Sequence, residues 1–157
     1  MKTRALVFLL PGALALEALL RLGGPLAHLA DPLLVVALVA ALPGRARPAL
    51  LVGLAAGLLD DAAFGKWFGC HALVDMTLAY GLALLAGFMD LGQALPRAIA
   101  IFAGSLASWG LELALVALFD LPPGPVPGPG SWLGMAAVNA ALGVLLAGWA
   151  TRRGWLD

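Results

Sequence analysis

The sequence has little charge and few side chains that carry chemistry. Only 11% of its 157 residues are charged, against about 25% in soluble domains, and nine basic residues balance nine acidic ones. Nothing therefore resembles a basic nucleic-acid surface or an acidic tail. The single cysteine, Cys70, excludes an internal disulfide. With one other histidine, the distant His28, the group Cys70, His71 and Asp75 falls short of a zinc site.

Apolar residues are what the chain has in excess. They make up 62% of the sequence, well above the roughly 45–50% of soluble proteins. The runs are continuous and rich in alanine and leucine, which favours helices over the alternating strands of a membrane barrel. The composition predicts an all-α integral membrane protein that forms a single transmembrane domain over residues 1–157.

Glycine, proline and charge divide the apolar sequence into segments of near-spanning length. We expect a six-transmembrane-helix bundle, with helices at residues 5–22, 27–42, 48–63, 68–88, 94–119 and 131–151. The second and third are close to the lower length limit, so a re-entrant pair is the alternative there. The first is expected to be a signal-anchor helix. The proline-rich stretch 121–130 should be a stiff non-helical connector.

The positions of lysine and arginine predict the orientation. One predicted side carries seven of them, against two on the other side, Arg21 and Lys66; the seven are Lys2, Arg4, Arg45, Arg47, Arg97, Arg152 and Arg153. Both termini should therefore face the cytoplasm, with the proline-rich connector outside.

Acidic residues within apolar spans are costly and are functional candidates by default. Glu17, Asp75 and Glu112 come out at similar depths, about 8–10 Å from the outer ends of their helices, and Asp60 and Asp61 lie towards the same side. We expect these carboxylates to line an outward-opening polar pocket or a shared binding seam. The competing interpretation is local charge pairing: Arg21 follows Glu17 by four residues, and Lys66 is in reach of Asp60 or Asp61.

Small residues recur at intervals of four, as in closely packed membrane helices. The pairs are Gly53 with Gly57, Gly65 with Gly69, Ala83 with Gly87, and Gly104 with Ser108. Packing within the bundle is favoured over dimerisation for any single pair. The serines lack a nearby base and a nucleophile elbow, so no enzyme is predicted.

Residues 51–80 resemble the rod-shape-determining protein MreD family. The sequence Leu51-Val-Gly-Leu-Ala-Ala-Gly-Leu-Leu-Asp60 is similar to that family's glycine-rich helix ending in Gly-Leu-x-x-Asp, and Gly65, Gly69, Leu73 and Ala79-Tyr80 follow in a similar order. The match covers about one fifth of the chain. Chain length and the expected number of spans also agree with the family.

The resemblance implies a non-enzymatic scaffold of the cell-elongation machinery, without a cofactor. It would bind the membrane protein MreC and help to couple it to MreB, RodA and a class B penicillin-binding protein during peptidoglycan synthesis. The family resembles the substrate-binding component of energy-coupling-factor transporters in fold. By that analogy the recognition region would include Gly53, Gly57, Asp60, Gly65, Gly69 and Tyr80, to which depth alone adds Glu17, Asp75 and Glu112.

A second function is the substrate-binding component of a vitamin-type transporter. The acids within the spans support it. The first helix weakens it, because such components resemble one another in an Ala-xxx-Ala docking pattern, and Ala5, Ala13, Ala15 and Ala18 do not have that spacing.

Overall fold

The computed structural model describes residues 3–23, 29–65, 67–122 and 128–156, and within them it is entirely helical. The six helices are α1 (Thr3–Leu22), α2 (Pro32–Ala41), α3 (Ala46–Phe64), α4 (Cys70–Leu85), α5 (Ala94–Leu118) and α6 (Pro129–Arg152). An all-helical chain with six helices is thus confirmed. Three helical segments are long and apolar enough to cross a membrane: Ala5–Leu22, Ala94–Leu118 and Pro129–Arg152.

The predicted helix boundaries agree within three residues except at the start of α2, which was predicted at residue 27 and begins at Pro32. The ten residues of α2 rise only about 15 Å, half the thickness of the hydrocarbon layer. Proline at the first helical position and the Asp31 side chain, which accepts a hydrogen bond from the Leu34 N–H, fix this start. This helix therefore lacks the length of a full span.

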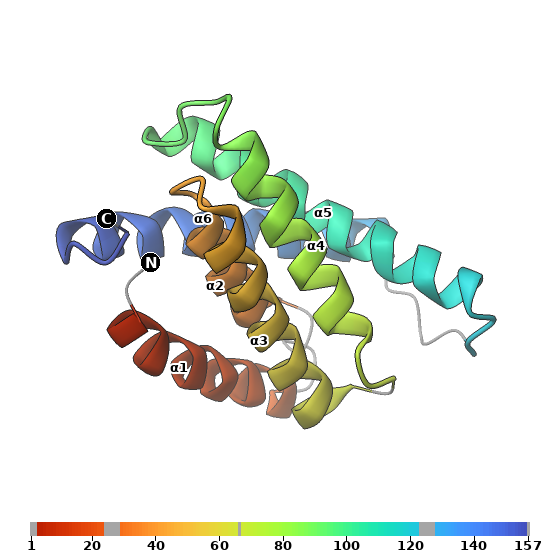
Figure 1. Ribbon diagram of the computed structural model, residues 1–157. Helices are drawn as coiled ribbons and strands as arrows, with labels where there is room; N and C mark the ends of the chain where they lie inside the picture. Colours follow the sequence, from red (N-terminus) through yellow and green to blue (C-terminus); the bar gives the residue numbers. More distant parts are fainter. Residues whose placement is uncertain (1–2, 24–28, 66, 123–127, 157) are drawn as a thin grey trace.

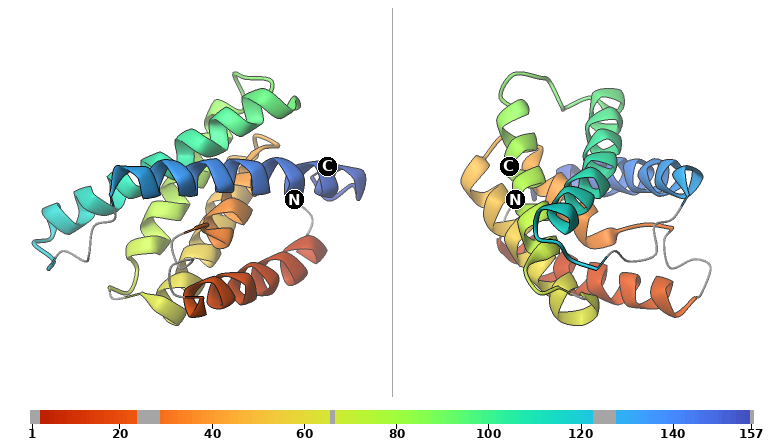
Figure 2. Two further views of the ribbon diagram at one scale, coloured as in Figure 1. Left: turned by 180° about the vertical axis from the view of Figure 1, so that it is seen from behind. Right: turned by 90° about the vertical axis from the view of Figure 1, so that its right-hand side faces the viewer.

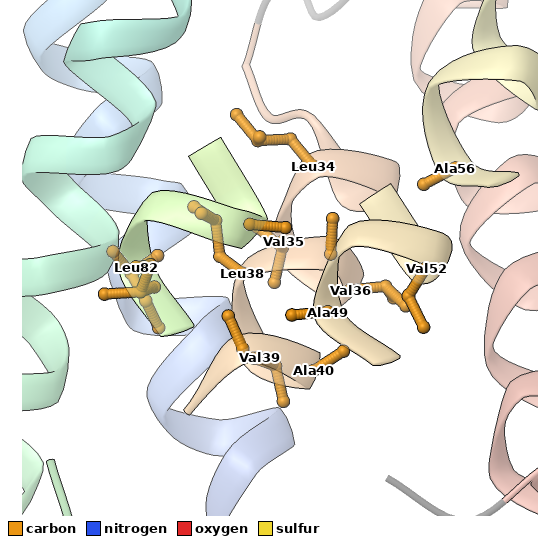
Figure 3. Packing of buried hydrophobic residues seen from close by; sticks show 14 of the residues in the cluster. Leu34, Val35, Val36, Leu38, Val39, Ala40, Ala49, Val52, Ala56 and Leu82 are labelled. Carbon is orange, nitrogen blue, oxygen red and sulfur yellow. The ribbon is translucent and has the colours of Figure 1, made fainter. Parts of the chain in front are cut away.

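The short helix α2 is the centre of the fold. It contacts each of the other five helices, and all ten of its residues are buried. Figure 3 shows Leu38 beside Leu82 of α4, and Val36 beside Val52 of α3. An apolar surface all round the helix is what a fully enclosed position requires. Hence the run Pro32–Ala41 is the core, and the longer helices surround it.

The other helices lie on different sides of α2. The helices α3 and α4 run side by side, and α6 passes on the side of α2 away from them (Figures 1 and 2). The helix α1 is peripheral and packs on α2 and α3. Large apolar side chains point outward from this assembly, among them Phe8, Leu22, Leu51, Phe88 and Leu118. Such an apolar exterior is expected of a membrane protein and not of a water-soluble one.

Candidate functional site: a buried acid cluster

The contact between α3 and α4 is close because Gly53 and Gly57 face it. A Cβ atom added at Gly53 would lie under 3.0 Å from the backbone of Asp75 and Met76, and one at Gly57 would meet His71 and Ala72 equally closely. Small residues permit backbones to approach in this way. This glycine pair therefore packs within the fold, as the sequence favoured, and it brings α4 against the acidic end of α3.

Asp61 ties that end of α3 to the start of α4. Its carboxylate accepts backbone hydrogen bonds from Gly69 (2.8 Å), His71 (3.2 Å) and Ala72 (3.1 Å). It thereby caps the N-terminus of α4 from another helix, where the amide groups and the helix dipole favour negative charge. Gly69 precedes α4 with φ +97°, a left-handed conformation that favours glycine.

Arg21 joins two further carboxylates. Its side chain donates to Glu17 on α1, with Nε 3.1 Å from Oε1, and its Nη2 lies 2.8 Å from Asp60 Oδ1 on α3. Glu17 and Asp60 are both buried, with 3% and 4% exposed area. The guanidinium also lies 4.2 Å from the ring centroid of Phe64, a cation–π contact. The predicted pair of Glu17 with Arg21 is confirmed, and the same arginine also bridges to α3.

Asp75 lies one turn further along α4 and is 4% exposed. Asp31, Asp60, Glu17 and Asp61 are near enough to act on it electrostatically. Among the described residues, no hydrogen-bond or ion-pair partner contacts its carboxylate. The Oε2 atom of Glu17 is likewise buried without a partner in the described part of the chain.

His71 contributes the second basic group. Its Nδ1 is 2.8 Å from Asp61 Oδ1 and 3.3 Å from Asp60 Oδ2. Its Nε2 is 3.9 Å from Oε1 of Glu112, which is half-buried on α5. His71 thus pairs with the acids of α3. In the described ranges, no group of three or more His, Cys, Asp or Glu side chains is arranged to hold a metal ion.

The start of α2 completes the arrangement. Asp31 caps this helix, and its N–H donates to Asn139 Oδ1 on α6 at 2.9 Å. The Nδ2 of Asn139 donates in turn to Ser105 Oγ on α5 at 3.2 Å. Asn139 and Ser105 are fully buried. Because they lie about ten residues inside α6 and α5, the N-terminus of α2 lies deep in the fold.

We call the carboxylates of Glu17, Asp31, Asp60, Asp61 and Asp75 the acid cluster. Its charge is opposed by Arg21, by His71 when protonated, and by the N-terminal ends of α2 and α4. Among the described residues, five carboxylates face two basic side chains, so the cluster favours a positively charged group. Lys66 and His28 lie outside the described residues, and the proposed contact of Lys66 with Asp60 or Asp61 is untested.

No protein-family model, curated protein or solved structure matches this chain.

The structure brings together most of the acids selected from the sequence. Glu17, Asp60 and Asp75 lie in the cluster, and Glu112 lies at its edge through His71. Gly53, Gly57, Gly65 and Gly69 shape the helix crossing and the loop beside it. Tyr80 is 40% exposed on α4, outside the cluster. That these residues line an outward-opening pocket or a shared binding seam stays a prediction.

Sequence reasoning missed Asp31 and Asn139 as parts of this site, and it did not foresee that Asp61 caps α4. Asp31 followed by Pro32 has the pattern of a helix N-cap, which could have shown that α2 starts there. Asn139 is a lone amide in an apolar helix, a recognisable sign of an interhelical hydrogen bond. The partners of both residues lie far along the chain and follow only from the fold.

Proposed function

We propose that this protein is a membrane scaffold of the bacterial cell-elongation machinery, of the MreD type, that binds MreC. Through MreC it would be coupled to MreB, RodA and a class B penicillin-binding protein during peptidoglycan synthesis. The observation that supports the proposal is that the resembling residues between 51 and 80 belong to one structural unit. The residues of the resemblance lie on a single helical hairpin, α3 and α4, and not on scattered elements.

Most of the resembling residues have a definable role in that hairpin. Gly53 and Gly57 permit the helix crossing, and Gly69 permits the turn into α4. Asp60 accepts from Arg21 and so holds α1 against the hairpin. A rigid hairpin with one outward face suits a scaffold, because lateral partners need a preformed surface. Tyr80 and Leu51, both exposed on this hairpin, are available for such contact.

The proposed setting is the inner membrane, with both termini in the cytoplasm. The proposed architecture is a six-helix bundle resembling the substrate-binding component of energy-coupling-factor transporters. Within it, α2 would be a half-span that begins at mid-depth and ends at the arginine-bearing turn 42–45, because its ten residues cannot cover the bilayer. The re-entrant alternative given for the second and third helices thus stays a proposal for α2, while the 19-residue α3 has close to full spanning length.

Co-purification tests the partner. The tagged full-length chain is isolated in mild detergent from membranes that contain MreC and from membranes that lack it, and both samples are analysed by mass spectrometry. We expect a stoichiometric complex with MreC. Replacing Tyr80 with Ala should reduce its yield, whereas the control Trp149→Ala, on an exposed part of α6, should not.

If MreC were absent from every sample of the purified chain, the scaffold proposal would be refuted. Reporter fusions at both ends test the setting independently, since opposite compartments for the two ends would contradict the orientation without bearing on MreC binding.

One observation favours the vitamin-type transporter component as a second candidate. Glu17 Oε2 is buried without a partner in the described part of the structure, and the buried Asp75 lies in the same acid cluster, as expected of groups that bind a ligand. The same mass spectrometry distinguishes the candidates. A retained small solute without MreC, lost on Asp75→Asn, would replace the scaffold with the transporter component.

A further inference from the structure

An apolar groove of about 580 Å³ opens between α4 and α5, away from the acid cluster. Its walls are formed by α4 from Thr77 to Leu85 and by α5 from Leu95 to Ala107, and Leu38 of α2 contributes to its floor. The Thr77 hydroxyl donates to the Leu73 carbonyl of its own helix, so it does not need a partner in the groove. The lining therefore selects hydrocarbon.

The dimensions of the groove limit what can fill it. The α5 wall from Leu95 to Ala107 is helical throughout and rises by about 18 Å. A transmembrane helix needs about 30 Å to span the bilayer, so the groove is too short to be covered by one along its whole length. An acyl chain covers one leaflet of about 15 Å, which matches the length of the groove.

The two ends of the groove differ as the two ends of a lipid do. The inner end, at Thr77 and Ala107, lies midway along the helices, and the other end lies at the loop between α4 and α5. Arg97 is next to this mouth: its Nε donates to the Leu91 carbonyl at 3.2 Å and its Nη2 to the Gly92 carbonyl at 2.8 Å. Within the described ranges Arg97 forms no ion pair, and the Asp90 carboxylate of the same loop accepts from the Gly92 N–H at 2.9 Å, so the guanidinium marks the headgroup level.

We propose that this groove binds one acyl chain of an anionic phospholipid, from the leaflet on the side of the α4–α5 loop, with the headgroup phosphate beside Arg97. The proposal needs only that the chain sits in a bilayer and is independent of MreC binding. Exposed Leu85, Leu95 and Ile99 on the walls would be covered by the chain. Apolar contact along the groove holds the lipid, and the arginine selects its charge.

Gly81 offers a way to fill the groove without disturbing the fold. It lines the groove, and a Cβ added there would meet nothing within 4 Å. Gly81→Leu therefore occupies the space of the acyl chain. Gly110→Leu is the matched control, because Gly110 is also helical and unobstructed but lies outside the groove. Ala103→Leu fills the groove from the α5 wall and serves as a second variant.

Native mass spectrometry of the full chain, released from its membranes in mild detergent, measures the retained lipid. We expect one phospholipid per chain in the unaltered protein and in Gly110→Leu, and at least about tenfold less in Gly81→Leu and Ala103→Leu. The proposal is overturned if Gly81→Leu and Ala103→Leu retain as much lipid as the unaltered protein. The unfolding temperatures must show that both variants are folded. A crosslinked second copy or partner helix in the groove also overturns the proposal.

A second measurement tests the headgroup. Phosphatidylglycerol and phosphatidylethanolamine are added together in equal amounts to delipidated protein, and the bound ratio is read from the masses. We expect a preference for phosphatidylglycerol that Arg97→Gln abolishes and that the control Arg153→Gln, whose guanidinium lies over Trp149, preserves. An unchanged ratio in Arg97→Gln refutes the role of Arg97.

Discussion

The helix crossing at Gly57 should be intolerant of a single added methyl group. In Gly57→Ala the new Cβ would lie under 3.0 Å from the backbone of His71 and Ala72, where ordinary contacts are 3.4–4 Å. These are backbone atoms, so no rotamer change relieves the overlap. The helices α3 and α4 must separate by roughly 1 Å in an interior packed as densely as a crystal.

The cost combines two effects. The first is overpacking, which typically costs about 1–3 kcal/mol. The second is that separating the helices lengthens the hydrogen bonds that Asp61 accepts from the start of α4. Each hydrogen bond to a charged group contributes about 1.5–3 kcal/mol. Alanine regains about 1 kcal/mol of helix propensity. We expect the free energy of unfolding to fall by about 2–4 kcal/mol, which corresponds to about 4–15 °C in the unfolding temperature.

Thermal unfolding in detergent, followed by circular dichroism, measures this change. Gly110→Ala is the control: its Cβ meets nothing within 4 Å, so it should gain up to about 1 kcal/mol from propensity alone. If Gly57→Ala were as stable as Gly110→Ala, the close approach of α3 and α4 would be wrong, and with it the positions of Asp61 and Asp75 in one site.

Three further changes probe the polar contacts. Arg21→Gln removes the cation that Glu17 and Asp60 share and should lower the unfolding temperature, while adding Glu17→Gln should restore part of the loss. Additive effects in this double-mutant cycle would contradict the ion pair of Arg21 with Glu17. Asn139→Ala should cost about 1–3 kcal/mol in chemical unfolding, because the Asp31 N–H loses its acceptor, and an unchanged midpoint would exclude that contact. Asp61→Ala should speed hydrogen exchange at the first amides of α4, and Asp61→Asn, which retains an acceptor, should speed it less. If Asp61→Ala exchanged at the rate of the unaltered protein, the proposed cap would be wrong.

Much of the fold could be predicted from the sequence because lipid-soluble helices are specified locally. About twenty apolar residues in a row can form all their backbone hydrogen bonds within one helix and need no distant partner. The helical class and most helix boundaries therefore follow from composition and from the glycine, proline and charged residues between the apolar runs. The position of α2 could not be predicted in this way. Apolar runs that face lipid and apolar runs that face protein look alike, and only the packed structure separates Pro32–Ala41 from the other helices.

In the acid cluster, too, some features follow from the local sequence and others only from the tertiary structure. Helical rise predicted similar depths for Glu17, Asp75 and Glu112, with Asp60 and Asp61 towards the same side, and a spacing of four residues paired Glu17 with Arg21. The structure confirms the pair and brings Glu17, Asp60 and Asp75 together. Which side chains face one another across helices depends on helix rotation and crossing. That is why Asp31, Asn139 and the cap formed by Asp61 are decided by tertiary structure alone. The sequence by itself therefore determined an apolar, helical chain with acids inside its apolar segments. Their convergence required the glycine crossing of α3 with α4, because only close backbone contact brings α4 against the carboxylates of α3.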